Sequence, residues 1–171
     1  MNLPPQRIMI FGRPGSGKST FAHLLHQVTK LPVYHLDKIF FISNWNKRNH
    51  QEYINLKKTF VDEEHWIIDG NNTKCLEMRY ARADLVLYFN YSRRICCWRI
   101  FKRLWTKDFS IDDRAERCPE VLRWPLILYM WTFEKRVAKQ IQNLKVKYPY
   151  TKFIEIRHDR DLAQLKKDMN L

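Results

Sequence analysis

Residues 11–20 read FGRPGSGKST, and they carry the most specific pattern in the chain. Residues 12–19 match G-x-x-x-x-G-K-[ST], in which glycines let successive backbone N–H groups turn inward around an anion. An apolar run, RIMIF at 7–11, precedes the loop, and apolar residues at helical spacing follow it over 18–28. The stretch predicts a strand, a phosphate-binding loop and a helix whose N-terminus faces the phosphates.

This loop has the residues that bind a nucleoside triphosphate. Lys18 can reach the outer phosphates, and the Ser19 hydroxyl can ligate a Mg²⁺ ion that bridges them. We therefore expect ATP and Mg²⁺ as cofactors. The predicted nucleotide-binding residues of the loop are Gly12, Arg13, Pro14, Gly15, Ser16, Gly17, Lys18, Ser19 and Thr20.

Apolar strands and amphipathic helices alternate along the rest of the chain. We expect strands in PVYHLD (32–37), WIID (66–69), DLVLYFN (84–90) and KFIEIR (152–157), and helices over 51–61, 93–105, 125–146 and 161–169. Apolar strands separated by helices predict a parallel sheet covered on both faces. The 171 residues fit one α/β domain, a three-layer P-loop NTPase fold with a five-stranded parallel sheet.

The composition indicates a soluble protein. Apolar residues make up 45% of the chain and charged residues 29%, and no apolar run approaches the length of a membrane helix. The N-terminus lacks the apolar core of a signal peptide. Cys75, Cys96, Cys97 and Cys118 lack the spacing of a metal site, so we interpret them as reduced thiols. We expect a cytoplasmic protein with no membrane partner.

The chain is strongly basic. Its formal charge is +13, which favours polyanionic partners, whether nucleotide phosphates, nucleic acid or acidic lipid. Residues 92–147 hold 14 Lys and Arg against 6 Asp and Glu, so about eight of the thirteen charges lie there. A solvated helical surface would give the same pattern. Trp98, Trp105, Trp124 and Trp131 lie among apolar neighbours, and we interpret them as packing in the core or lid rather than stacking on bases.

The strand ends favour a kinase over a motor ATPase. Asp69 ends the strand WIID, but Gly70 stands where a motor commonly has a Glu that activates water. The strand LVLYFN ends in Asn90 and offers no acid there. Asp69 would be a metal-site residue together with Ser19, although an Asp-Gly pair also forms turns.

Transfer to a bound acceptor needs cations at the migrating phosphoryl group and a lid that excludes water. Arg99 and Arg103 stand four residues apart, on one face of the predicted helix 93–105. The polar stretch at about 107–120, with Arg114 and Arg117, is the predicted lid. For both arginine pairs a solvated surface is the alternative interpretation.

The ordered set of motifs resembles a known group. GRPGSGKST, WIIDGN and WRIFKR have the order and spacing of adenylate kinase-like and shikimate kinase-like P-loop kinases. Together with VYHLD (33–37), Trp45, Arg93-Arg94 and CPE (118–120), they are more similar to the bacterial family named DNA topology modulation protein. The resemblance covers nearly the whole chain. It implies a five-stranded parallel core, an acceptor region over about 38–65, and a lid.

The resemblance also implies roles for single residues. Asp37 would meet the acceptor hydroxyl, although an Asp there can also cap a helix, and Asp69 would reach Mg²⁺ through water. Arg99 and Arg103 would contact phosphates or adenine. The implied acceptor-binding residues are Asp37, Trp45, Asn71 and Arg79.

Two positions depart from the patterns of these kinases. His35 stands where shikimate kinase-like enzymes have the first Asp of Asp-x-Asp. Asn72-Thr73 replaces the Pro-Arg of adenylate kinases, so the pattern does not support a nucleoside monophosphate acceptor.

The predicted function is transfer of the γ-phosphoryl of ATP to an unidentified small molecule, with Lys18, Asp37, Arg99 and Arg103 as catalytic residues. The alternative is a nucleotide-controlled protein that binds DNA through the basic segment 93–147 and modulates its topology.

Overall fold

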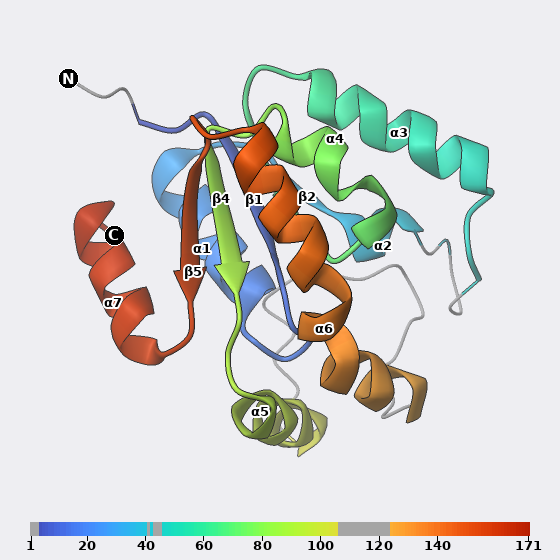
Figure 1. Ribbon diagram of the computed structural model, residues 1–171, viewed down its shortest axis with the longest axis vertical. Coiled ribbons are helices and arrows are strands. Elements are labelled where there is room, and N and C mark those ends of the chain that lie inside the picture. The colour runs from blue at the N-terminus through green and yellow to red at the C-terminus, as the bar shows by residue number, and fades with distance from the viewer. Residues whose placement is uncertain (1–3, 41, 43–45, 106–123) are drawn as a thin grey trace.

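Five strands form one parallel sheet in the order β2-β3-β1-β4-β5. The computed structural model describes residues 4–40, 42, 46–105 and 124–171. The strands are β1 (Arg7–Gly12), β2 (Val33–His35), β3 (Trp66–Asp69), β4 (Leu85–Phe89) and β5 (Lys152–Ile156). All four neighbouring pairs are parallel, so the strands end at one edge of the sheet, towards the bottom of Figure 1.

Helices cover both faces of this sheet. They are α1 (Lys18–Thr29), α2 (Leu36–Phe40), α3 (His50–Asp62), α4 (Leu76–Tyr80), α5 (Arg93–Trp105), α6 (Trp124–Lys147) and α7 (Asp159–Asp168), with a 3₁₀ turn η1 (Thr73–Cys75). Buried residues of α1, α5 and α7 pack on one face, and those of α2, α3, α4 and most of α6 pack on the other. Figure 1 shows α6 crossing in front of the sheet and α1 behind it. The expected three-layer α/β fold is confirmed.

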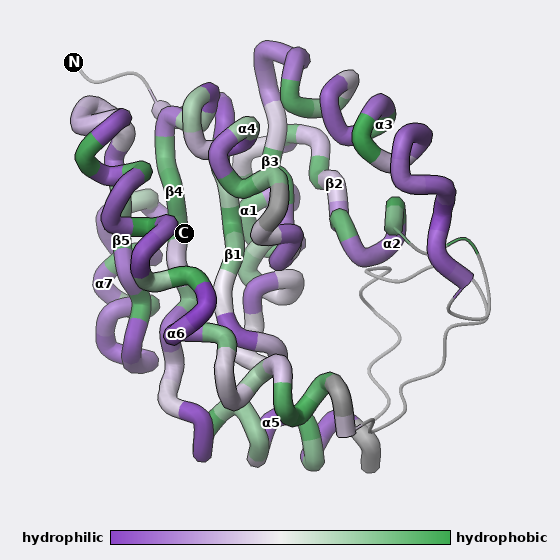
Figure 2. The backbone as a smooth tube through the Cα atoms, turned by 45° about the vertical axis from the view of Figure 1, so that its right-hand side comes forward, coloured by the Kyte–Doolittle hydropathy of each residue, from purple (hydrophilic) through white to green (hydrophobic). Residues whose placement is uncertain are grey.

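Alternation along β1 supplies both halves of the core. Ile8 and Ile10 belong to the cluster under α1, whereas Met9 and Phe11 belong to the cluster under α6. A strand buried on both faces requires such a continuous apolar run, because successive side chains point to opposite faces. The central strands β1 and β4 are accordingly largely hydrophobic in Figure 2.

The strand predicted over 32–37 is wrong at its last two residues, Leu36 and Asp37. β2 ends at His35, and the chain turns into the short helix α2. Leu36 is buried there against Gly70, where an added Cβ would lie 2.6 Å from the Leu36 Cβ. Asp37 therefore lies in the first turn of a helix, where its negative charge suits the helix dipole.

The structure contradicts packing in the core for the tryptophans whose side chains it describes, whereas packing against the lid concerns residues outside the described ranges. Trp98 is 69% exposed, Trp124 83% and Trp131 48%. The inward positions of α5 and α6 are taken instead by Cys96, Ile100 and other residues of the two clusters. No described helix is long and apolar enough to cross a membrane.

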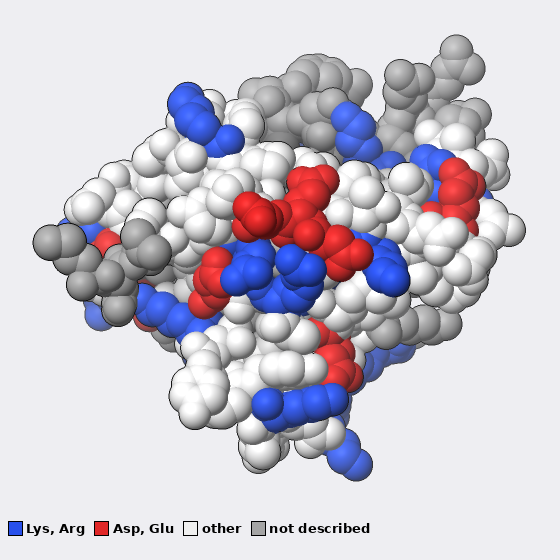
Figure 3. Space-filling model, turned by 90° about the horizontal axis from the view of Figure 1, so that it is seen from above, with Lys and Arg blue, Asp and Glu red and all other residues white. Residues whose placement is uncertain are grey.

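The end of the molecule at which the strands begin carries paired charges. Its ion pairs include Arg7–Asp84 at 2.6 Å, Arg82–Asp62 at 3.4 Å and Lys147–Glu77 at 2.6 Å. Figure 3, which looks onto this end, shows acidic and basic side chains intermixed. The phosphate-binding loop lies at the opposite end, where the strands finish.

Candidate functional site

The loop between β1 and α1 has the backbone that phosphate binding requires. Gly15 and Gly17 have φ of +78° and +91°, in the left-handed region that favours glycine. A Cβ at Gly15 would lie 2.6 Å from the Cys96 carbonyl oxygen, so the loop packs closely on α5. Gly17 caps α1 without a side-chain hydrogen bond, which leaves the first N–H groups of the helix for an anion.

Neighbouring strands hold this loop in place. The Arg13 backbone N–H donates to the Phe89 carbonyl at 3.0 Å, and the Gly12 N–H donates to Asn71 Oδ1 at 2.9 Å. Asn71, an expected acceptor-binding residue, therefore contacts the phosphate loop itself. Lys18 folds back over the loop, with Nζ 3.3 Å from the Arg13 carbonyl oxygen.

Ser19, Asp69 and His35 meet beside the loop. Ser19 Oγ donates to Asp69 Oδ2 at 2.7 Å, and His35 Nδ1 lies 3.0 Å from the same oxygen. The parallel register sets His35 opposite Asp69 at the ends of β2 and β3. Burial raises the pKa of Asp69, but the hydrogen bond from His35 and the charge of Lys18 outweigh it and hold this pKa below its usual value. Asp69 is therefore a carboxylate at neutral pH.

The hydroxyl of Ser19 and the carboxylate of Asp69 are oxygen ligands that fit a magnesium ion. Asp69 is 4% exposed, and its Oδ1 is buried with no hydrogen-bond partner within the described part of the chain. A hydroxyl and a carboxylate are oxygen ligands of the kind that Mg²⁺ takes, usually with phosphates and water completing its shell. The described residues hold no cluster of three or more His, Cys, Asp or Glu side chains able to bind a metal alone. The pair therefore suits a nucleotide-associated ion rather than an all-protein metal cage.

The lowered pKa of Asp69 predicts an acid-sensitive stability. Between the folded pKa and the unfolded value of about 3.9 the unfolded chain binds more protons, so this contribution is complete above about pH 5 and is lost as pH falls through the folded value. We expect Asp69→Asn to lower the free energy of unfolding by about 1–3 kcal/mol at pH 7. Urea titrations from pH 7 down to about pH 3 measure the difference from the wild type. A difference that stays constant over this range would contradict the assignment.

Arg99 projects from α5 onto the phosphate loop. Its Nη1 donates to the Ser16 carbonyl at 3.0 Å, and its Nη2 donates to Asp159 Oδ1 at 2.8 Å. The guanidinium also lies over the ring of Tyr91, with Cζ 4.4 Å from the centroid. Arg103, the second member of the expected pair, lies one turn further along α5 and is exposed. Arg99 thus touches the phosphate loop directly.

Asp37 and Arg79 lie on the side expected to receive the acceptor. Asp37 is exposed. Burial and then the charge of Asp37 raise the pKa of Tyr129 to about 12. Arg79 is fully buried and donates to the carbonyls of Gly70 at 3.1 Å and Asn72 at 3.4 Å. Its guanidinium therefore supports the backbone on both sides of Asn71, and burial lowers its pKa to about 10.

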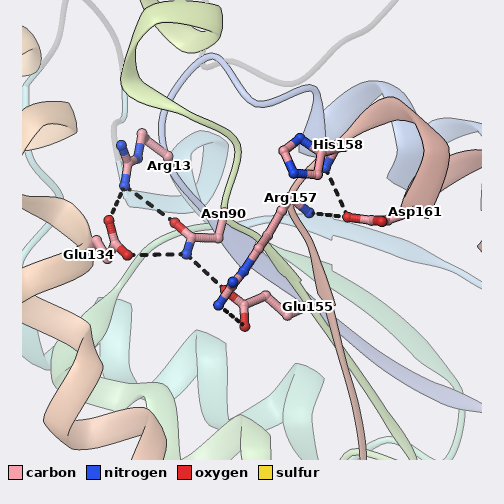
Figure 4. Close-up of polar contacts among 7 residues, drawn as sticks. All are labelled: Arg13, Asn90, Glu134, Glu155, Arg157, His158 and Asp161. Carbon is pink, nitrogen blue, oxygen red and sulfur yellow. Dashed lines mark hydrogen bonds and ion pairs between the residues drawn. The ribbon is translucent and has the colours of Figure 1, made fainter.

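Arg13 connects the loop to α6, which the sequence did not suggest. The side chain is 2% exposed, and its Nη2 lies 3.0 Å from Glu134 Oε2 and 3.3 Å from Asn90 Oδ1. Asn90 Nδ2 in turn donates to Glu155 Oε1 at 2.9 Å, and Glu155 accepts from Arg157. Figure 4 shows this chain of contacts passing from the loop to α6 and to the end of β5. Arg13 and Glu134 are 121 residues apart, so no local pattern could reveal the pair.

Lys57 is a second residue that sequence reasoning missed. It is fully buried on α3, with Nζ 4.8 Å from the centre of the Tyr53 ring. Nζ finds no hydrogen-bond partner among the residues described. One sequence signal was available, because Tyr53, Lys57 and Val61 are spaced by four and therefore share one helical face, with apolar residues on either side of the lysine.

Several predicted residues fall outside the described ranges. They are Trp45, Cys118 and the whole lid of about 107–120 with Arg114 and Arg117. Their roles stay predictions.

We compared the chain with protein families, curated proteins and solved structures, and only solved structures gave matches. No family model and no curated protein matches the chain. Among solved structures, shikimate kinase from Acinetobacter baumannii in complex with shikimate is 11% identical, with a TM-score of 0.58 over 96% of this chain and 93% of that one. Shikimate kinase from Bacteroides thetaiotaomicron is 14% identical, with a TM-score of 0.55 over 98% and 100% of the two chains. Deoxyadenosine kinase from M. mycoides with bound dATP is also 14% identical, with a TM-score of 0.55 over 97% and 100%.

At these identities the likeness establishes the fold alone. The resemblance to the DNA topology modulation family stays a prediction. With its glycine loop, its parallel strand order and these neighbours, the chain has the fold of the P-loop kinases.

Proposed function

We propose that this protein is a kinase that transfers the γ-phosphoryl of ATP to a small molecule. The observation that carries the proposal is the meeting of Lys18, Ser19 and Asp69 at the glycine loop. These groups suit the phosphates and the metal ion of a nucleoside triphosphate. The solved neighbours support the same class by analogy, since they are named shikimate kinase and deoxyadenosine kinase.

The loop binds the phosphates in this proposal. The first N–H groups of α1 donate to phosphate oxygens, and Lys18 exchanges the Arg13 carbonyl for the outer phosphates. A Mg²⁺ ion held by the Ser19 oxygen, and by Asp69 through water, would offset the phosphate charge. Arg99, which already touches the Ser16 carbonyl, adds a cation at the same end.

Transfer requires one bond to form and one to break. An acceptor hydroxyl oxygen attacks the γ-phosphorus, and the bond from this phosphorus to the bridging oxygen of ADP breaks. Lys18 and Arg99 stabilise the charge on the transferring group. Asp37, exposed on α2, takes the proton of the acceptor hydroxyl. Gly70 follows Asp69, so the position after the strand holds no Glu to activate water, and that favours an acceptor over hydrolysis.

A panel of acceptors tests the proposal. We expect at least one hydroxyl compound, from a set that includes shikimate and nucleosides, to stimulate ADP release from Mg-ATP. Asp37→Asn should lower kcat for this reaction at least about a hundredfold and leave the affinity for ATP unchanged, because Asp37 acts only on the acceptor. Asp168→Asn, the same change on exposed α7, is the control and should keep full activity. ATP turnover that no acceptor stimulates and that survives Asp37→Asn would contradict the proposal.

A further inference from the structure

Two helices expose large apolar side chains that the core does not use. On α5, Arg94, Trp98, Phe101 and Lys102 share one exposed face at helical spacing. On α6, Trp124, Leu128, Trp131 and Lys135 do the same. We call these eight residues the aromatic–basic face. Its apolar members are 48–83% exposed, which is unusual for side chains of this size.

The two halves of this face adjoin. The Arg93 guanidinium of α5 lies over the Trp131 ring of α6, with Cζ 5.2 Å from the centroid. The Cys97 and Met130 sulfur atoms, also from the two helices, are 4.0 Å apart. Figures 1 and 2 both show α5 beside the beginning of α6 at the same end of the molecule. The exposed indoles therefore belong to one surface.

The surroundings of this surface are positively charged. α5 contains five Lys and Arg and no acidic residue, and the first ten residues of α6 carry no charge. The next residue, Glu134, is paired with Arg13. A partner that binds the aromatic–basic face must accordingly carry negative charge and also provide an apolar environment for the exposed side chains.

We propose that the aromatic–basic face docks on an anionic lipid bilayer. Tryptophan, phenylalanine and leucine side chains enter the boundary between headgroups and acyl chains, while Arg94, Lys102 and Lys135 meet anionic headgroups. The contact is peripheral, through the surfaces of two helices that the protein already forms, and no described helix needs to span the membrane. The proposal therefore revises the expectation that the protein has no membrane partner.

Other occupants fit this surface less well. A second copy would bring Arg94, Lys102 and Lys135 against the same three cations, and this repulsion opposes association. Duplex DNA would meet the cations with its phosphates but leave the indoles in water. Single-stranded DNA stacks on aromatic rings, but Leu128, which is 61% exposed, provides no ring.

Vesicle binding by the full chain tests the proposal. We expect the protein to float with phosphatidylcholine vesicles that contain about one third phosphatidylserine, to bind pure phosphatidylcholine far more weakly, and to show a blue shift of tryptophan emission on binding. The double variant Trp98→Ala/Trp131→Ala should lose about tenfold or more in vesicle affinity. Arg94→Gln/Lys102→Gln should lose about fivefold for each cation removed, and less at high salt.

Matched variants separate docking from general effects. Tyr150→Ala removes a fully exposed aromatic ring elsewhere, and Lys166→Gln/Lys167→Gln removes two cations from α7. Both should bind vesicles as the wild type does. Thermal melting should show that all variants stay folded, since the altered side chains of the face are exposed.

Four results would overturn the proposal. They are failure to bind anionic vesicles, equal binding to neutral ones, binding that the face variants leave unchanged, and a dimer in sedimentation that the tryptophan variant dissolves. Binding to single-stranded DNA that depends on the tryptophans, without vesicle binding, would assign the face to nucleic acid instead.

Discussion

Lys18→Ala is expected to weaken Mg-ATP binding by about ten- to a hundredfold and to slow phosphoryl transfer by a further hundred- to thousandfold. The binding loss follows from removing a charged donor to the phosphates. The loss in rate follows because the same ammonium stabilises charge that develops only during transfer. Lys18 Nζ donates to the Arg13 carbonyl oxygen at 3.3 Å, and a phosphate oxygen can take the place of this acceptor.

Calorimetric titration with Mg-ATP and the acceptor-stimulated release of ADP measure the two effects. Lys167→Ala removes the same side chain from an exposed position on α7, and it should change neither quantity. Lys18→Arg keeps the charge but alters its reach, so we expect it to keep most of the affinity and still lose rate. Thermal melting separates these losses from unfolding. Normal Mg-ATP affinity in folded Lys18→Ala would remove Lys18 from the nucleotide site.

Local sequence patterns were sufficient for most of the fold. The buried strands β1, β3 and β4 are short apolar runs next to turns, and a run buried on both faces has few alternatives in an α/β chain. The glycine loop could also be predicted from its sequence, because Gly15 and Gly17 adopt backbone angles that other residues avoid. Asp69 could also be placed near the phosphates from its position alone, because it ends an apolar strand of a parallel sheet.

Contacts between segments that are far apart in the chain could not be predicted from the sequence. His35 reaches Asp69 only because β2 pairs with β3, and strand order is a property of the whole sheet. Arg13 reaches Glu134 because α6 packs across the sheet beside the loop. The exposed tryptophans were misassigned for a related reason. Apolar residues next to a tryptophan in the sequence predict that it is buried. Which side of a helix is buried, however, depends on the part of the fold against which that helix packs.

Lys57→Met is expected to raise the free energy of unfolding by about 1–3 kcal/mol at pH 7. Lys57 is fully buried, and the Tyr53 ring at 4.8 Å does not replace the hydrogen bonds that its ammonium makes in water. Methionine has a similar volume and no charge to desolvate. Lys58→Met, on the exposed side of the same helix, should change stability by no more than about 0.5 kcal/mol.

The dependence of this gain on pH identifies its cause. Burial lowers the pKa of Lys57, and the nearby Cys75 thiol opposes the shift without reversing it. Between the lowered folded pKa and the unfolded value of about 10.4 the unfolded chain binds more protons, so the wild type gains stability as pH rises through that interval. The advantage of Lys57→Met should therefore shrink towards pH 10, as urea titrations at several pH values would show. Destabilisation by Lys57→Met would contradict this prediction and show that the buried ammonium stabilises the fold. A variant that stays folded but loses acceptor-stimulated release of ADP would instead give Lys57 a role in the reaction.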